Sequence, residues 1–286
     1  MIKHVPKPEW LKIKLGDTPQ YAHTATLLHT RGLNTICASG KCPNQGECWS
    51  RGTATFMIGG NICTRACRFC NTQSGRPLPL DINEGERIAK TVEELKLRYV
   101  VLTSVDRDDL ADYGAGHWIR VINNVRERCP EVIIEALIPD FRGDLKLVDD
   151  VCRTDARVVA HNIETVERLT PEVRSVATYR TSLSVISQIA RSGKTAKSGL
   201  MLGLGETEEE VIQTMRDLHE AGCEVLTIGQ YLQPTRKHYP VQAYINPKKF
   251  EEYKQKGLEI GFRIVESGAL VRSSYHADAI LEDDKS

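Results

Sequence analysis

Three cysteines at fixed spacing constrain this chain more than any other feature. Cys63, Cys67 and Cys70 fall within eight residues, after a β-prone run and the pair Gly59-Gly60. A closed structural zinc site takes four protein ligands, so three thiols leave such a site one ligand short. An iron–sulfur cluster held by three cysteines keeps one iron open to a ligand that is not protein. The spacing therefore favours a cluster with an open iron, where chemistry can occur.

A second group of three cysteines precedes the first. Cys37, Cys42 and Cys48 belong with the first group to a single stretch that holds six of the nine cysteines. Pro43-Asn44 favours a turn, so we expect a loop around a bound group and neither helix nor strand. Our interpretation is a second iron–sulfur cluster. Structural zinc that recruits a fourth ligand from elsewhere is the alternative.

The other cysteines and the charge balance exclude several classes of protein. Cys129, Cys152 and Cys223 stand in apolar or helix-like contexts and are interpreted as small buried side chains. The 38 basic residues equal the 38 acidic ones, which argues against a nucleic-acid or membrane surface as the main partner. No apolar run reaches the length of a membrane span, and the first residues lack the apolar core of a signal peptide. We expect a cytoplasmic protein.

Short β-rich runs alternate with helical patterns along the chain, which predicts an α/β fold with parallel strands joined by helices. Thr207 with Glu210 forms a capping box, while Thr170-Pro171 and Asn246-Pro247 each pair a cap with proline at a helix start. Six such units suggest a partial (β/α)6 TIM-type barrel. The predicted strands are Thr53–Ile58, Tyr99–Thr103, Val132–Ile138, Ala156–His161, Ser198–Leu202 and Val225–Gly229.

Polar motifs follow four of the predicted strands, where barrels of this type place their active sites. They are Ser104–Asp109, His161–Glu164, Gly203–Glu206 and Gln230–Thr235. A single polar strand end is commonly a turn or a helix cap, but four together predict a shared binding mouth. His161 is expected to be a hydrogen-bonded structural residue, and Asp106–Asp109 could be a solvated charge run. The Gly-Leu-Gly sequence at Gly203 favours close backbone approach to a ligand.

The Cys-x3-Cys-x2-Cys spacing resembles the signature of the radical S-adenosylmethionine enzymes. Phe69 matches the aromatic residue usual before the last cysteine. In that superfamily the open iron binds the amino and carboxylate groups of S-adenosylmethionine. Electron transfer into the sulfonium then yields a 5'-deoxyadenosyl radical. The resemblance implies the same chemistry at Cys63, Cys67 and Cys70.

Nearly the whole chain is similar to one family within that superfamily, the lipoyl synthases. The similarity is carried by Cys42–Trp49, Gly52–Ile58, Val101–Asp109, His161–Thr165, Lys197–Glu206, Ile228–Thr235 and Arg272–Tyr275. Three departures from the family pattern remove no ligand. Ala38-Ser39-Gly40 replaces acidic residues, Tyr113 stands where glycine is common, and Ala269 stands where proline is usual.

The resemblance implies a radical S-adenosylmethionine barrel with extensions at both ends. It divides the chain into an arm at 1–50 with auxiliary-cluster ligands, a barrel at 51–245, and a C-terminal helix and extension at 246–286. Ser274 is implied as the fourth ligand of the auxiliary cluster beside Cys37, Cys42 and Cys48. The residues implied as catalytic are Cys63, Cys67, Cys70 and Ser274. Contacts with S-adenosylmethionine or substrate are expected from Phe69, Ser104, Asp106, Asn162, Glu164, Gly203 and Gly205.

The implied activity is that of a sulfurtransferase of lipoate biosynthesis, with S-adenosylmethionine and two [4Fe-4S] clusters as cofactors. It inserts two sulfur atoms at C6 and C8 of an octanoyl chain on a carrier lysine, and the auxiliary cluster is consumed as sulfur donor. Implied partners are octanoylated 2-oxoacid dehydrogenase E2 subunits and glycine cleavage H protein, a flavodoxin- or ferredoxin-type reductant, and an iron–sulfur carrier for repair. A biotin synthase-like enzyme and a non-enzymatic zinc or redox module are the rival interpretations.

Overall fold

The computed structural model describes residues 7–11, 18–51 and 54–274. Thr53 of the first predicted strand, Tyr275 of the Arg-Ser-Ser-Tyr motif and the outer parts of the predicted arm and extension lie outside the described residues. The chain forms two compact units. The first unit comprises Ile13–Ala66 and Asn71–Val159, and the second comprises Met1–Lys12, Cys67–Cys70 and Ala160–Ser286. The division at 50 and 245 stays a prediction.

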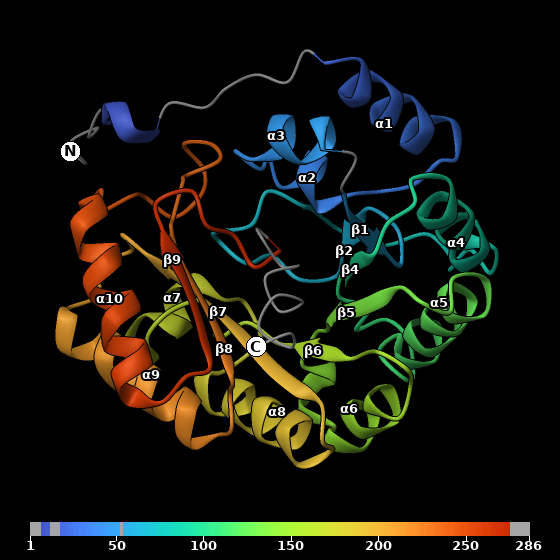
Figure 1. Cartoon of the computed structure of the whole chain (residues 1–286). Helices are drawn as coiled ribbons and strands as arrows, with labels where there is room; N and C mark the ends of the chain where they lie inside the picture. Colours follow the sequence, from blue (N-terminus) through green and yellow to red (C-terminus); the bar gives the residue numbers. More distant parts are fainter. Residues whose placement is uncertain (1–6, 12–17, 52–53, 275–286) are drawn as a thin grey trace. The chain divides into compact units, whose positions relative to one another are not determined.

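The first unit is built on parallel strands covered by helices. Strands β1 (Thr55–Ile58), β4 (Tyr99–Ser104), β5 (Ile133–Leu137) and β6 (Val158–Ala160) lie side by side in that order. Helix α4 (Glu84–Glu94) packs on α5 (Ala115–Arg128), which packs on α6 (Leu145–Cys152; Figure 1). Ile88 and Val92 of α4 are buried, as are Val121 and Val125 of α5. These pairs recur at the four-residue spacing that places apolar side chains on one face of a helix.

Short helices carry the first cysteine group of the first unit. Helix α1 (Pro19–Thr30) packs on α3 (Gln45–Ser50), and α2 (Ile36–Ser39) packs on β1. The expected loop is confirmed at Cys42, which lies in the connection between α2 and α3 with a turn at Pro43-Asn44. It is wrong for the other two thiols, because Cys37 lies in α2 and Cys48 in α3. Thr35 caps α2 by accepting the Ala38 N–H at 3.2 Å. Helices of four and six residues are too short to produce a helical hydrophobic period.

Other short elements of the first unit frame the second cysteine group. Strand β2 (Ile62–Cys63) pairs in parallel with β3 (Gln73–Ser74). The 3-10 helix η2 (Phe141–Gly143) follows β5, and Asp140 caps it by accepting the Arg142 N–H at 3.0 Å. Cys63 thus ends a strand and leads directly into the remaining thiols of its triplet.

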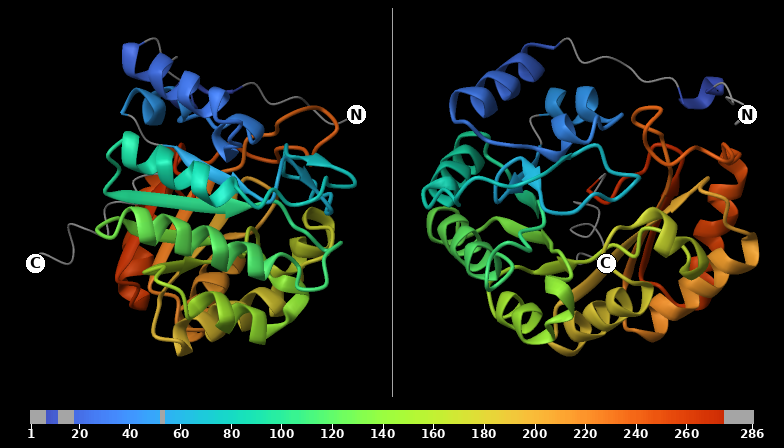
Figure 2. Two further views of the ribbon diagram at one scale, coloured as in Figure 1. Left: turned by 90° about the vertical axis from the view of Figure 1, so that its right-hand side faces the viewer. Right: turned by 180° about the vertical axis from the view of Figure 1, so that it is seen from behind.

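The second unit continues the alternation of strand and helix. Strands β7 (Thr195–Leu202), β8 (Val225–Gln230) and β9 (Ile264–Gly268) are parallel and lie in that order. Helix α8 (Tyr179–Arg191) packs on β7, and α10 (Pro247–Ile260) packs on β9 and on α9 (Glu208–Glu220; Figure 2). The shorter elements are η1 (Glu9–Leu11), η3 (Glu167–Leu169) and α7 (Thr170–Val173). No helix within the described residues is long and apolar enough to cross a bilayer.

The predicted α/β fold with parallel strands is confirmed. Every predicted strand is present with shifted ends, but β9 was missed because Glu266 and Ser267 interrupt its apolar run. Thr207 and Asn246 cap their helices as predicted. The prediction that Thr170 caps a helix is wrong. Leu169 occupies the N-cap position of α7, because η3 runs directly into this helix. The Thr170 hydroxyl instead donates to the Val166 carbonyl at 3.0 Å.

Tyr113 occupies a backbone conformation that explains why glycine is common there in the resembled family. Its φ is 50°, in the left-handed region that costs an L-residue about 1–2 kcal/mol. Tyr113→Gly is expected to raise the free energy of unfolding by roughly 0.5 kcal/mol, because relief of this strain exceeds the chain-entropy cost of glycine. Denaturant titration measures the change.

Ala111→Gly is the matched control for this prediction. Ala111 is exposed and lies in the same turn without a positive φ. Glycine there adds chain entropy to the unfolded state without relieving strain, so stability should fall by about 0.5–1 kcal/mol. Equal losses in the two variants would contradict the strain at Tyr113.

Candidate functional site

The Cys63 sulfur lies among hydrogen-bond donors in the first unit. The backbone N–H groups of Arg65 and Asp106 donate to it at 3.4 and 3.3 Å. Burial and the Asp106 carboxylate raise the pKa of Cys63 to about 12, and the two N–H groups act in the opposite direction. A bound metal releases the thiol proton, and these donors then stabilise the resulting thiolate. The surroundings of Cys63 therefore fit a cluster ligand.

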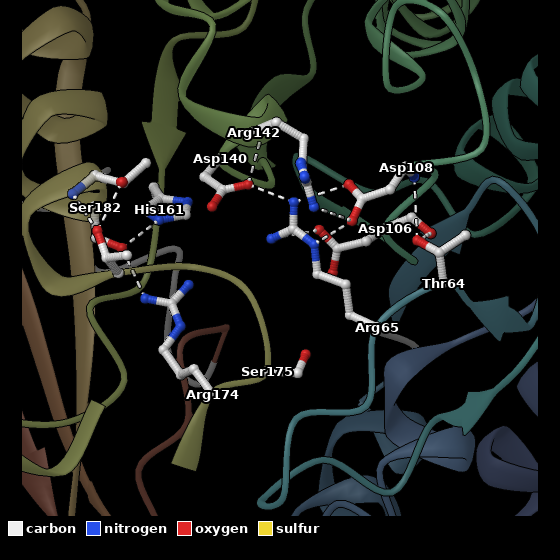
Figure 3. Close-up of polar contacts among 12 residues, drawn as sticks. Thr64, Arg65, Asp106, Asp108, Asp140, Arg142, His161, Arg174, Ser175 and Ser182 are labelled. Atoms are coloured by element: carbon white, nitrogen blue, oxygen red, sulfur yellow. Dashed lines mark hydrogen bonds and ion pairs between the residues drawn. The ribbon is translucent and has the colours of Figure 1, made fainter. Parts of the chain in front are cut away.

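Arg65, two residues after this thiol, is the centre of a buried ion network (Figure 3). Its Nε and Nη2 atoms donate to the Asp108 carboxylate at 2.8 and 2.9 Å, and Nη2 also donates to Asp140 at 2.6 Å. Asp106 lies 3.3 Å from Nη1. Burial raises the pKa of Asp106, and the guanidinium opposes that shift. One guanidinium thus fixes the cysteine loop to the end of β4 and to η2.

A second polar cluster holds the turn between β1 and Cys63. Glu84 accepts the Gly59 N–H at 2.9 Å and lies 2.6 Å from His117 Nε2. Arg107 donates to the Gly59 carbonyl at 3.1 Å and pairs with Asp109 at 2.8 Å. Asp106–Asp109 is therefore not a solvated charge run. Its three carboxylates pair with Arg65 and with Arg107 of the run itself.

The thiols of Cys37, Cys42 and Cys48 are gathered in the first unit. Burial and then the charges of the other two thiols raise the pKa of Cys48 to about 12. Burial also raises the pKa of Cys37, and the backbone N–H of Thr55 opposes the increase. Donors around a sulfur suit a thiolate bound to iron, so this triplet also fits a cluster.

Neither triplet is arranged around one ion. Within 7–11, 18–51 and 54–274, no three His, Cys, Asp or Glu side chains could hold a single metal ion. A [4Fe-4S] cluster spreads its ligands over several iron atoms, so its thiols need not converge on one point. The cluster ligands, including Ser274, therefore stay a prediction.

The end of α7 and the loop after β8 hold the segment Cys67–Cys70 in the second unit. The Arg68 N–H donates to the Val173 carbonyl at 2.8 Å, and the Tyr239 N–H donates to the Arg68 carbonyl at 2.8 Å. The Arg68 guanidinium also lies 4.9 Å from the centre of the Tyr239 ring. Phe69 is half-buried. These contacts fix the backbone between the two thiols from both sides.

The residues after α7 and after β8 also contact Cys67 and Cys70 themselves. The Cys67 sulfur lies 3.6 Å from the Ser175 hydroxyl, and the Cys70 carbonyl lies 3.0 Å from His238 Nε2. The other ring nitrogen of His238 lies 2.9 Å from the Thr235 hydroxyl. The polar residues after β8 therefore orient the backbone at the last cysteine. The sequence alone did not indicate this role.

His161 is a buried, hydrogen-bonded residue, as predicted. Its Nε2 lies 3.0 Å from the Ser182 hydroxyl, to which Arg174 also donates at 2.7 Å (Figure 3). Both contacts lie within the second unit. The position suits orientation of the chain after β6 better than proton transfer.

Asn162 and Glu164 meet the C-terminal motif in the second unit. Asn162 Nδ2 donates to Glu164 at 3.1 Å and to the Ser273 hydroxyl at 2.7 Å. The Asn162 Oδ1 atom is buried and has no partner among the described residues. Glu164 has a φ of 69°, and burial raises the pKa of its carboxyl. A strained acidic residue beside an unpartnered acceptor is typical of a ligand-binding position.

Sequence reasoning missed two residues beside this group. A Cβ at Gly199 would lie 2.8 Å from Asn162 Oδ1 and 3.0 Å from Ser273 Oγ, so glycine allows the close contact. Ser273 precedes the proposed ligand Ser274, which is half-buried. No sequence signal separates Ser273 from Ser274 as the partner of Asn162.

The Gly203–Glu206 turn is closed by its own carboxylate. Glu206 accepts the Gly203 and Leu204 N–H groups at 2.5 and 2.9 Å. A Cβ at Gly203 would lie 2.2 Å from Gln230 Nε2, so the close approach there is to protein. Gly205 is exposed, and Ser104 is half-buried at the end of β4. Contacts of Gly203, Gly205 and Ser104 with S-adenosylmethionine stay predictions.

Comparison with known proteins identifies the family. Residues 57–218 match the Radical SAM superfamily. A lipoyl synthase of Treponema denticola is 60% identical over 274 residues, covering 95% of this chain and 94% of its own length. The chain belongs to the lipoyl synthase family. A lipoyl synthase of Bacteroides fragilis is 57% identical over 276 residues, with 96% of each chain covered.

A solved structure agrees with the fold of this lipoyl synthase family member. The crystal structure of methylornithine synthase has a TM-score of 0.56 and 15% identity, and the match covers 88% of this chain and 83% of that one. At this identity the likeness concerns the fold alone. Membership of the lipoyl synthase family rests on full-length identity, and it excludes both the biotin synthase-like and the zinc-module interpretations.

Proposed function

We propose that this chain inserts two sulfur atoms at C6 and C8 of an octanoyl chain carried on a lysine of a lipoyl carrier domain. The observation that carries the proposal is full-length identity of 57–60% with lipoyl synthases, in a chain with two cysteine triplets. S-adenosylmethionine and two [4Fe-4S] clusters are the cofactors of this activity. When bound, one cluster supplies the electron that cleaves S-adenosylmethionine, and the other supplies sulfide to the carbon radicals.

The chain's residues divide between the two cofactor sites. Cys63, Cys67 and Cys70 are assigned to the cluster that reduces S-adenosylmethionine. The donors around Cys63 and the ion network of Arg65 support this assignment, because they fix the loop that carries the ligands. The auxiliary cluster is assigned to Cys37, Cys42, Cys48 and Ser274. Its support is the gathering of the three thiols and the donors around Cys37.

Contacts with S-adenosylmethionine are assigned to the strand-end residues. Asn162 Oδ1 and the Glu164 carboxylate are acceptors, which suits the hydroxyl and ammonium donors of this cofactor. Phe69, Ser104, Asp106, Gly203 and Gly205 complete the proposed set. Asp106 is already engaged by Arg65, so its contribution is expected to be indirect through the position of Cys63.

Partners follow from the chemistry. Lipoyl carrier domains are the substrates, and we assign them to 2-oxoacid dehydrogenase E2 subunits and glycine cleavage H protein. Cleavage of S-adenosylmethionine needs an electron, for which a flavodoxin- or ferredoxin-type reductant is proposed. Because the auxiliary cluster is consumed, an iron–sulfur carrier is proposed for its repair. A cytoplasmic location is proposed, because thiol ligands stay reduced in that compartment.

Anaerobic reconstitution tests the proposed function. The loaded protein is expected to contain about eight iron atoms per chain, as two [4Fe-4S] clusters require. With reductant and S-adenosylmethionine, an octanoyl-lysine peptide should gain the mass of two sulfur atoms, while the same peptide with unmodified lysine should not change. Cleavage of S-adenosylmethionine without sulfur in the octanoyl peptide would contradict the proposal.

A further inference from the structure

The side chain of Asn162 engages two polar groups through its nitrogen and leaves its oxygen unused. Nδ2 donates to Glu164 at 3.1 Å and to the Ser273 hydroxyl at 2.7 Å. Oδ1 is buried and has no partner in the part of the chain that the structure describes. Leaving a buried acceptor unpaired is costly, so such groups are rare in native proteins. The arrangement indicates that Oδ1 receives a donor from a bound ligand.

The orientation of the Asn162 amide depends on both acceptors. The last side-chain torsion of asparagine is broad, so a single contact leaves the amide free to tilt or to turn over. An ionised carboxylate only accepts hydrogen bonds, so Glu164 favours the orientation with Nδ2 toward it. The Ser273 hydroxyl provides a second acceptor, and at 2.7 Å it is the nearer of the two. The two contacts together give Oδ1 one direction.

Contacts within the second unit hold the segment that carries Ser273. The Val271 N–H donates to the Gly268 carbonyl at 3.0 Å, which closes a turn directly after β9. A Cβ at Gly229 would lie 2.2 Å from the Val271 carbonyl oxygen, so β8 lies against this segment. Asn162 belongs to the same unit. The backbone therefore presents the Ser273 hydroxyl to Asn162 without a contribution from any ligand.

We propose that Ser273 is a positioning residue for S-adenosylmethionine, because it holds the Asn162 amide with its oxygen toward a donor of the cofactor. The inference rests on the proposed function, which assigns Asn162 and Glu164 to this cofactor. The two adjacent serines then have separate roles, since Ser274 is assigned to the auxiliary cluster. A side chain that is oriented before binding adds affinity, because less conformational freedom is lost when the ligand binds.

Binding of S-adenosylmethionine to the anaerobically reconstituted full chain tests the inference. Equilibrium dialysis without reductant measures Kd while no cofactor is cleaved. Ser273→Ala removes the hydroxyl, so Kd is expected to rise about 10-fold, as for the loss of one hydrogen bond. Ser273→Thr restores a hydroxyl and should recover most of the lost affinity. Gly199→Ala places a methyl group against Asn162 Oδ1 and Ser273 Oγ, so it should weaken binding in the same direction.

Steady-state kinetics separates positioning from a loss of folded protein. The contact with Asn162 is made equally before and during cleavage, so Ser273→Ala should raise the KM for S-adenosylmethionine and leave kcat near that of the parent. A smaller folded fraction would instead lower kcat. Ser267→Ala is the matched control. Ser267 is half-buried in β9 and its hydroxyl donates to the Phe250 carbonyl at 2.7 Å, so its removal should change neither Kd nor KM.

Iron content distinguishes one failure from another. Ser273→Ala should keep about eight iron atoms per chain, as two [4Fe-4S] clusters require. Loss of about four iron atoms would make Ser273 a cluster ligand and overturn the inference. An unchanged Kd in Ser273→Ala, or an equal rise in Ser267→Ala, would also overturn it and leave the proposed function intact. A parent that holds both clusters but does not bind S-adenosylmethionine would contradict the proposed function, and the inference with it.

Discussion

Arg65→Leu is expected to lower the free energy of unfolding by about 3–5 kcal/mol, the usual cost of removing one partner from a buried ion network. The side chain of Arg65 is 3% exposed and that of Asp140 is 2% exposed. Without the guanidinium, three carboxylates share a poorly solvated site and must repel one another or take up protons. Denaturant titration of the anaerobic protein measures the loss.

The same variant should also lose cleavage of S-adenosylmethionine, because Asp106 donates its N–H to Cys63 and Arg65 fixes Asp106. Arg65→Lys keeps the charge but cannot form the planar fork, so it should fall between the parent and Arg65→Leu.

Arg142→Leu is the matched control for Arg65→Leu. Arg142 lies 3.7 Å from Asp108 and its side chain is 48% exposed, so its removal should cost at most about 1 kcal/mol. Equal losses of stability in Arg142→Leu and Arg65→Leu would show that the buried network has no special role.

The Arg65 network also shows where sequence reasoning ends. The strands could be predicted because runs such as Tyr99–Thr103 are rich in β-branched and apolar residues and are bounded by polar ones. Arg65 and Asp140 are separated by 75 residues and are joined only by the folded chain. The pattern Asp106–Asp109 alone could not distinguish a surface charge run from three carboxylates facing buried arginines. Only their positions after β4 pointed to a site.

The candidate sites divide in the same way. Spacing made the thiols visible, because few other arrangements place three cysteines within eight residues. The groups around the thiols come from distant or unpatterned positions and carry no local signal. Asp140 is typical of a cap of a short helix, and Ser273 is typical of a turn. Their roles depend on atoms that face them, which sequence does not specify.

Cys67→Ala is expected to abolish cleavage of S-adenosylmethionine, whereas Cys42→Ala should spare cleavage and abolish sulfur insertion. The reason is that each triplet is assigned to a different cluster, and a cluster held by three cysteines is lost when one of them is removed. Chromatography of 5'-deoxyadenosine measures cleavage, and mass spectrometry of the octanoyl-lysine peptide measures insertion. The two readouts separate radical formation from sulfur donation in one reaction mixture.

Cys152→Ala is the control for loss of a thiol as such. Cys152 is 2% exposed in α6 and belongs to neither triplet, so both readouts should stay near those of the parent. If Cys42→Ala also abolished cleavage, the auxiliary triplet would be needed to assemble the first site and the division of roles would be wrong. If Cys67→Ala retained cleavage, the radical would arise elsewhere. Retained cleavage in Cys42→Ala with loss of about four iron atoms per chain is the result that two separate clusters require.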